Sequence, residues 1–261
     1  MGGFDSDYDI QKRDCYMPIA VPDLWHFAAM AAVVFGAALA QGVGGIGFAM
    51  FAAPVAALCF PQLAPGPLLT LGGFISLLTA LRERGAIDWP AVGYALTGRA
   101  AGTLIAIYAM ARFAPQALGL LFAAMILAAV GLSAAGLRFA ATPGRVSGAG
   151  VASGIMGTMT SVGAPPIALV LQHAEPPRLR ATLGMVLFLG SIFSLAMLAL
   201  ADRYTGYHVA LALSLAPFLL AGFAVSGRLR SRLPPRAVRA VLLAACAIGA
   251  LGVIAKALWL G

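Results

Sequence analysis

Residues 41–47 read Gln41-Gly42-Val43-Gly44-Gly45-Ile46-Gly47, and they interrupt an apolar segment that runs from residue 24 to residue 60. One α-helix over that whole segment would be about 55 Å long at about 1.5 Å per residue, whereas the hydrocarbon core of a bilayer is about 30 Å thick. Glycines at this density disfavour a helix. The segment is therefore predicted to tilt, break or turn back, with close helix packing through small residues as the alternative role of the glycines.

The composition outside this stretch points to the same class of protein. The chain has 261 residues, of which 61% are hydrophobic and 10% charged, against about 45–50% and about 25% in soluble domains. Runs of about 20 apolar residues are long enough to span a bilayer. We therefore expect an all-α polytopic membrane protein of about eight transmembrane helices. The apolar segments are 24–60, 67–81, 92–111, 117–137, 148–172, 181–200, 207–227 and 238–260.

The chain also matches itself when it is shifted by 112 residues. The paired positions are Gly36 with Gly148, Gly42 with Gly154, Gly45 with Gly157, Pro54 with Pro166, Pro65 with Pro177, and Thr70-Leu71-Gly72 with Thr182-Leu183-Gly184. Two homologous halves of four elements are predicted, 24–137 and 148–260, which form a single membrane domain. Each half begins with an interrupted helix, an arrangement that points to a transporter whose binding site lies between the halves.

The second interruption uses different residues from the first. Thr160, Ser161 and Gly163 are followed by Pro165 and Pro166, and this combination cannot continue a regular helix. Gly154 and Gly157 precede it at a spacing typical of close helix packing. Pro217, within the seventh segment, predicts a kink that could serve as a hinge.

Charged residues indicate how the chain is oriented. Residues 1–23 contain five aspartates and no early apolar region, so we expect an extramembrane tail and no cleavable signal. The arginines after the seventh segment predict a cytoplasmic loop. Alternating from there places Arg112, Arg178 and Arg180 inside, and Arg82, Arg84, Arg138, Arg145 and Arg203 outside. The N-terminus is then outside if 24–60 crosses once, and inside if it forms a hairpin.

These motifs resemble the sulfite exporter TauE/SafE family of membrane proteins over residues 27–260. The resemblance rests on a glycine cluster followed by a proline in each half, with Pro54 and Pro166, and then a helix that contains Thr70 or Thr182. Two features depart from the family pattern. Thr158, Thr160 and Ser161 replace part of the second glycine cluster, and the first cluster lacks three consecutive glycines. The resemblance implies export of sulfite, a sulfonate or a related small organic anion across the bacterial inner membrane.

An anion site can be proposed from the residues themselves. Broken helices offer backbone N–H groups to anions, glycine allows close approach, and Arg99 is the one formal charge well inside an apolar segment, where a charge suggests function. Snorkelling of Arg99 to the interface and bonding of hydroxyls to their own helix are the alternatives. The predicted substrate-binding residues are Gln41, Gly44, Gly45, Gly47, Arg99, Thr160, Ser161 and Gly163. The predicted structural or hinge residues are Gly42, Pro54, Gly154, Gly157, Pro165, Pro166 and Pro217.

Other functional classes find little support in the sequence. No acidic residue lies inside an apolar segment, the three cysteines are scattered, and no metal-binding or nucleotide-binding motif is present; the chain is expected not to be an enzyme, and to need no metal and no cofactor. The expected partners are a small anion and the lipid bilayer, with a homo-oligomer possible and nucleic acid excluded. Two alternatives stay open: an importer or carrier of another anion such as a carboxylate, and a scaffold subunit that transports nothing.

Overall fold

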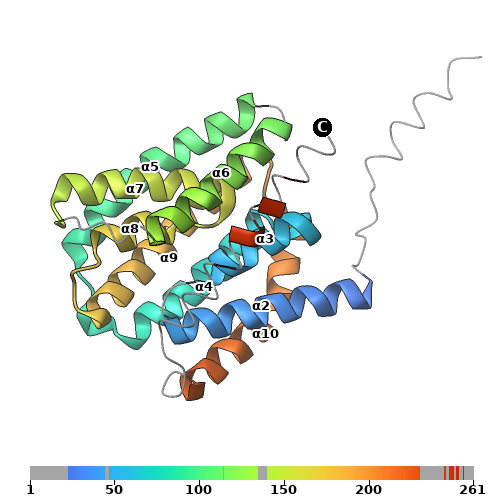
Figure 1. The fold of residues 1–261 in the computed structure, drawn as a ribbon, viewed down its shortest axis with the longest axis horizontal. Helices are drawn as coiled ribbons and strands as arrows, with labels where there is room; N and C mark the ends of the chain where they lie inside the picture. Colours follow the sequence, from blue (N-terminus) through green and yellow to red (C-terminus); the bar gives the residue numbers. More distant parts are fainter. Residues whose placement is uncertain are drawn as a thin grey trace, which may run out of the picture.

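The structure is a computed structural model, and it describes residues 23–44, 47–113, 115–134, 140–229, 244, 247–249, 251–252 and 255. All regular elements in these ranges are helices (Figure 1), which confirms the predicted all-α class. The helices are α2 (Leu24–Gly44), α3 (Phe48–Cys59), α4 (Gly66–Arg82), α5 (Trp89–Arg112), α6 (Pro115–Ala134), α7 (Pro143–Thr160), α8 (Ala164–Val170), α9 (Pro176–Leu200) and α10 (Gly206–Leu229), with the short 3₁₀ helices η1 (Pro61–Leu63) and η2 (Arg84–Ala86).

Three of the described helices are long and apolar enough to cross a membrane by length and composition. They are α2, α9 and α10, while α3 and α4 are shorter apolar helices. The last predicted segment, 238–260, lies largely outside the described residues. The layout of eight helices in two halves, 24–137 and 148–260, stays a prediction.

The first long segment folds back on itself. Helix α2 ends at Gly44 and α3 begins at Phe48, so the predicted break is present. The ring of His26 near the start of α2 lies 6.1 Å from the ring of Phe60, just beyond α3. Gly47 has a φ of 142°, a conformation that side chains rarely adopt. The two helices therefore form a hairpin, one of the two arrangements that the sequence left open.

The second interrupted segment also reverses direction. Helix α7 ends at Thr160, and Ser161 adopts the left-handed conformation with a φ of 63°. Ser153, within α7, donates its hydroxyl to the carbonyl oxygen of Gly163 at 2.6 Å. Soon after the end of α7, the chain therefore runs back alongside this helix. Segment 148–172 was expected to be a single span, and the structure divides it into α7 and the short α8.

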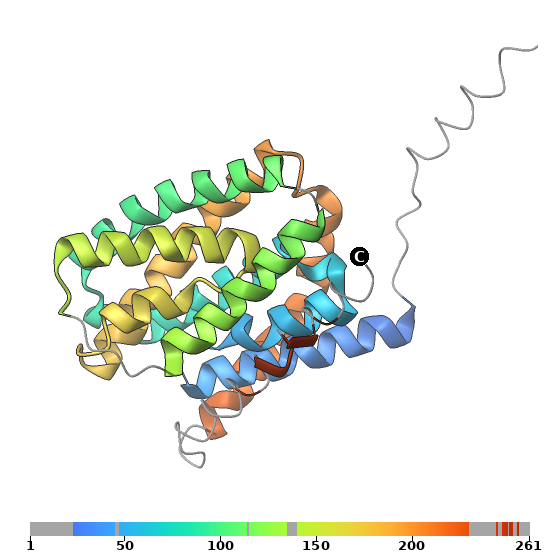
Figure 2. The same ribbon diagram turned by 45° about the horizontal axis from the view of Figure 1, so that its top comes forward.

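Three helix pairs make the main contacts of the molecule: α4 with α9 in the middle, α5 with α7 on one side of them, and α2 with α10 on the other (Figures 1 and 2). Glycines allow the α5–α7 pair to approach closely. A Cβ on Gly98 or Gly102 would strike the α7 backbone at Ser147 or Val151, and one on Gly154 would strike the backbone of α5. This contact agrees with the packing role predicted for Gly154.

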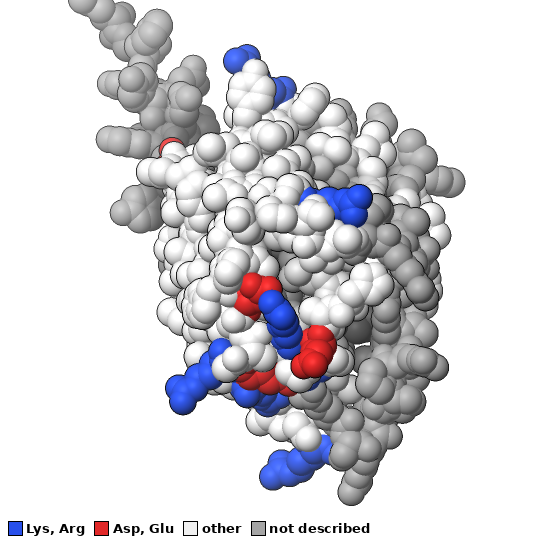
Figure 3. Space-filling view, turned by 90° about the vertical axis from the view of Figure 1, so that its left-hand side faces the viewer, with Lys and Arg blue, Asp and Glu red and all other residues white. Residues whose placement is uncertain are grey.

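Relative to the end that carries Arg228, the predicted sides of Arg178, Arg180 and Arg203 agree with the structure, while those predicted for Arg82, Arg84, Arg112 and Arg145 are wrong. Arg138 lies outside the described residues. Arg178 pairs with Asp88 at 2.6 Å, and Arg180 donates from Nε and Nη2 to the two carboxylate oxygens of Glu83. The start of α9 therefore lies at the same end of the molecule as the α4–α5 loop. Figure 3 shows acidic and basic side chains side by side on this face. At the other end, Arg203 donates to the carbonyl oxygen of Met110.

The hairpin of α7 and α8 explains the error. A segment that enters and leaves at the same end, instead of crossing once, reverses the predicted side of every loop before it. In the described part of the chain, Arg112 and Arg203 lie at one end. The opposite end carries Arg82, Arg84, Arg145, Arg178, Arg180 and Arg228. Because His26 lies beside Phe60, α2 begins at the end that carries Arg203.

Candidate functional site

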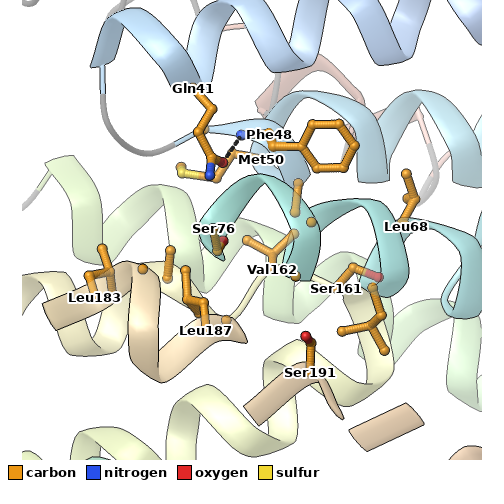
Figure 4. A pocket seen from close by; sticks show the side chains of 18 of the residues that line it. Gln41, Phe48, Met50, Leu68, Ser76, Ser161, Val162, Leu183, Leu187 and Ser191 are labelled. Carbon is orange, nitrogen blue, oxygen red and sulfur yellow. Dashed lines mark hydrogen bonds between the residues drawn. The ribbon is translucent and has the colours of Figure 1, made fainter. Parts of the chain in front are cut away.

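A cavity of about 40 Å³ lies between the two interrupted segments and the central helices α4 and α9 (Figure 4). A single water needs about 10–15 Å³ of such space, so the cavity suits a small ligand. Its walls are mostly apolar, with few polar groups, as is usual in ligand sites. The lining residues are Gln41, Gly47, Phe48, Ala49, Met50, Leu68, Leu69, Gly72, Gly73, Ser76, Thr79, Arg99, Ser161, Val162, Gly163, Ala164, Leu183, Gly184, Leu187 and Ser191.

Arg99 is the charged residue of this cavity. It sits near the middle of α5 and is 2% exposed, so it does not snorkel to an interface. Its Nη1 donates to the hydroxyl of Ser153 at 2.7 Å, and Ser153 donates in turn to the carbonyl oxygen of Gly163. Its Nε is buried and has no hydrogen-bond partner. A buried donor without a partner is costly in a folded protein.

Three glycines make room for the Arg99 side chain. A Cβ on Gly157 would lie 2.9 Å from Nη2, one on Gly163 would lie 2.8 Å from Nη1, and one on Gly190 would collide with Nε. Gly157 was predicted as a structural residue and Gly163 as a ligand. Gly190 was not predicted, because the sequence gives no sign that the side chain of Arg99, about 90 residues earlier in the chain, would pass it.

At the first interruption, two of the predicted binding residues line the cavity. Gln41 accepts the N–H of Phe48 at 3.0 Å through Oε1 and so joins the two sides of the break (Figure 4). Gly47 is the N-cap of α3, directly before Phe48. Gly44 is exposed and does not line the cavity, while Gly45 lies outside the described residues.

At the second interruption, Ser161 and Gly163 line the cavity but Thr160 does not. Thr160 donates its hydroxyl to the carbonyl oxygen of Met156 at 2.7 Å and accepts the N–H of Val162, as the alternative of bonding to its own helix predicts. Ser161 donates to the carbonyl oxygen of Pro65 at 3.0 Å, which ties this break to the start of α4.

The prolines limit what the second break can offer an anion. Pro165 and Pro166 occupy the first turn of α8 and have no N–H. Between residues 162 and 166, therefore, only Gly163 and Ala164 keep a backbone N–H that is not already bound to Thr160. The expectation that both breaks present a row of backbone donors holds better for α3 than for α8.

The remaining predicted structural residues are distributed over the helix contacts. Pro54 is buried within α3, and Pro217 lies inside α10. A Cβ on Gly42 would collide with the side chain of Ser226 in α10, so Gly42 serves the α2–α10 contact. The structure therefore gives packing roles to Gly42, Gly154 and Gly157.

Sequence reasoning missed several hydroxyl residues around the site. Ser76 and Thr79 of α4 and Ser191 of α9 line the cavity, although each is an isolated polar residue in an apolar run. Next to the site lie three further buried hydroxyls that hydrogen-bond to one another at 2.9–3.2 Å; they belong to Thr103, Thr158 and Ser194. Only the burial that the tertiary structure creates distinguishes these residues from ordinary helix-bound hydroxyls.

Comparison with known proteins gives one match. A family model described as "Sulfite exporter TauE/SafE" matches residues 30–253, which is most of the chain. No curated protein and no solved structure matches.

Proposed function

Since the chain belongs to the sulfite exporter TauE/SafE family, we propose that it is a secondary transporter that moves a small sulfite-type anion through the cavity beside Arg99. The family assignment and the apolar helices make it a membrane transport protein. The substrate, the direction of transport and the bacterial inner membrane as its location belong to the proposal. Among the possible transport functions, the family name favours export of a sulfur oxyanion or a sulfonate.

The observation that carries the proposal is the unbalanced charge of Arg99. Burial of a charge costs several kcal/mol unless a partner compensates it, and the described part of the chain places no carboxylate against this guanidinium. An anionic substrate in the cavity would supply the missing charge. Since the residues in contact with Arg99 are serine and glycine rather than acids, nothing there would compete with an anion for it.

The geometry narrows the set of residues proposed to contact the substrate. Gln41, Gly47, Arg99, Ser161 and Gly163 line the cavity and are retained. Gly44 and Thr160 are left out because neither lines it. The backbone of Ala49 and Met50, in the first turn of α3, joins the set because both line the cavity, where N–H groups of a helix start favour anions.

The helix pairing supports the proposed arrangement in two halves. The third apolar segment of each half packs against the first segment of the other half, α5 against α7 and α10 against α2, while the second segments, α4 and α9, meet in the centre. Both interruptions border the same cavity. A site formed between two repeats is the usual arrangement in transporters with broken helices.

Transport can be tested with the purified protein in liposomes. We expect saturable sulfite flux with the wild type, and a loss of about tenfold to hundredfold with Arg99→Gln, since a hydrogen bond to a charged group is worth about 1.5–3 kcal/mol. Arg99→Lys keeps the charge without the fork of donors and should retain part of the flux. Arg84→Gln, which changes an exposed arginine on η2, is the matched control.

The alternatives predict other outcomes of the same measurement. Flux of a carboxylate but not of sulfite would assign the protein to another anion. An absence of flux for all anions in folded protein would favour the scaffold function. Comparison of inward and outward gradients would show whether the carrier favours export.

A further inference from the structure

We infer that the cavity takes its substrate as a singly charged anion, and that an oxoacid such as sulfite is carried in its singly protonated form rather than as the dianion. The inference rests on the proposed transport function and concerns the charge of the substrate. Three features of the cavity lead to it: the number of its charges, the direction of its hydroxyl groups and the apolar character of the rest of its wall.

The charges of the cavity balance one negative charge. Arg99 is the only charged residue among the described residues that line it, and it is 2% exposed. A singly charged anion beside Arg99 makes the site neutral. A dianion leaves one net negative charge in a region shielded from water, where an unpaired charge is strongly disfavoured.

More distant charges do not change this balance. The charged side chains on the helices around the cavity lie within five residues of a helix end, far from the middle of α4 and α9. They are Arg82 on α4, Arg112 on α5, Arg145 on α7, Arg178 and Arg180 on α9, and Arg228 on α10. Arg178 and Arg180 are in addition paired with Asp88 and Glu83. Helices α2, α3 and α8 carry no Lys, Arg, Asp or Glu.

Three of the four hydroxyl side chains among the described residues that line the cavity, all except that of Ser76, turn their oxygen atoms rather than their protons to a ligand. Thr79 donates to the carbonyl oxygen of Ile75 at 2.8 Å, Ser191 donates to that of Phe188 at 2.7 Å, and Ser161 donates to that of Pro65 at 3.0 Å. The proton of each of these three hydroxyls is thus already in a hydrogen bond, and toward a ligand each oxygen can only accept one. Acceptors do not stabilise a second negative charge, but they can bind the O–H of a protonated oxoanion.

The other walls offer little further stabilisation. The side chains of Met50, Leu68 and Leu187 face the cavity (Figure 4) and carry no hydrogen-bond donor. The N–H of Phe48 is bound to Gln41, and that of Val162 is bound to Thr160. The other donors that remain, such as the amide group of Gln41, the hydroxyl of Ser76 and the free backbone N–H groups at the two breaks, are uncharged. Among the described residues that line the cavity, Arg99 therefore supplies the one full positive charge. The site therefore matches an anion with one charge, one face of acceptor oxygens and either a hydroxyl or a small apolar group on its other side.

Three anions of similar size separate the possibilities in proteoliposomes. Methanesulfonate carries one charge throughout the accessible pH range, sulfate carries two, and sulfite changes from one charge to two as the pH rises. We expect methanesulfonate to compete with labelled sulfite at every pH and sulfate to compete at least tenfold more weakly. The sulfite flux at constant total concentration should fall with rising pH in proportion to the singly protonated form.

Two controls make the pH profile interpretable. Liposomes without protein give the passive leak, which is subtracted at each pH, and liposomes with Arg99→Gln show how much of the remaining flux depends on this residue. The flux of methanesulfonate itself, measured over the same pH range, reports any effect of pH on the protein, since the charge of this anion is constant.

The outcomes distinguish this inference from the proposed function. Equal competition by sulfate and methanesulfonate, or a sulfite flux that rises with pH, would overturn the inference while transport itself stands. If no anion is transported at any pH by folded wild-type protein, the proposed function fails and the inference fails with it.

Discussion

At the scale of single residues, the position of Arg99 depends on its neighbours having no side chains. Gly157, Gly163 and Gly190 surround the guanidinium, and Ser153 holds Nη1. An arginine side chain has several rotatable bonds and therefore many rotamers. To hold it in one position, its surroundings must block the other rotamers and leave the observed one free of steric conflict. The three glycines satisfy the second condition.

Substitution of Gly190 tests this role without removing the charge. In Gly190→Ala the new Cβ collides with Nε of Arg99, which must leave its place in the cavity. We expect sulfite flux to fall about tenfold or more, close to the effect of Arg99→Gln, with an overpacking cost of about 1–3 kcal/mol. Gly93→Ala, where a Cβ would meet nothing within 4 Å, is the control. Wild-type flux in Gly190→Ala would contradict this account of the site.

Asp88 makes a second prediction at the residue scale. It accepts the N–H of Ala91 and so caps the start of α5, and it pairs with Arg178. Partial burial by itself raises the pKa of Asp88, but the hydrogen bonds from Arg178 and Ala91 and the charge of Arg178 outweigh this effect and hold the pKa below its usual value. A lowered pKa in the folded state stabilises the protein above the unfolded pKa, and this stabilisation is lost as the pH falls.

Thermal unfolding in detergent at several pH values measures this effect. Asp88→Ala should lower the stability by about 1 kcal/mol at neutral pH, as expected for an N-cap. Asp88→Asn keeps the cap but loses the exposed ion pair, and should cost less than about 1 kcal/mol. The difference between wild type and Asp88→Asn should shrink as the pH falls through about 4. A difference that stays constant with pH would show that the carboxylate charge contributes nothing.

At the scale of helices, the α5–α7 pair is held together by backbone contact. Gly98 and Gly102 on α5 face the carbonyl groups of Ser147 and Val151 on α7, an approach that only small residues permit. This contact also positions the site, because Arg99 follows Gly98 directly and Ser153 lies on the opposing helix. The packing of one pair of helices therefore decides where the charge lies.

One substitution on each helix distinguishes backbone contact from ordinary helix propensity. In Gly98→Ala the Cβ would collide with the carbonyl oxygen of Ser147, and we expect a loss of about 1–3 kcal/mol in stability. Gly148→Ala on α7 places its Cβ in open space and should be neutral or stabilise the helix by up to about 1 kcal/mol. Unfolding temperatures of the two variants in detergent give the comparison. Equal stability of the two would mean that the helices can separate without cost.

At the scale of the whole molecule, the distribution of arginines predicts its orientation. Among the described residues, the end that carries Glu83 and Asp88 holds six arginines and the opposite end holds Arg112 and Arg203. An excess of Lys and Arg marks cytoplasmic loops. The end with Glu83 and Asp88 is therefore expected in the cytoplasm, and the start of α2 on the other side.

Labelling of single cysteines in whole cells tests the orientation. The three native cysteines are first replaced by serine, and Arg84→Cys or Arg112→Cys, both at exposed positions, is then introduced. An impermeant thiol reagent added outside should label Arg112→Cys and spare Arg84→Cys until the cells are opened. The reverse pattern would place the basic end outside and contradict the assignment.

The sequence by itself determined the helical class, the membrane setting, the family and the position of both interruptions. These properties follow from local composition, since apolar runs of sufficient length require a bilayer and since glycine and proline disfavour a helix wherever they cluster. The sequence also singled out Arg99, because a charge in an apolar run is conspicuous without knowledge of its neighbours.

The tertiary structure alone decided how the interruptions turn and what surrounds Arg99. That the α7–α8 segment reverses direction depends on the contact of Ser153 with Gly163, and this reversal corrected the side of every arginine before it. The roles of Gly190, Ser191 and Thr79 depend on which helices meet at the cavity. Such contacts join residues far apart in the chain, so their energies are invisible to composition and spacing, which report only on neighbours in sequence.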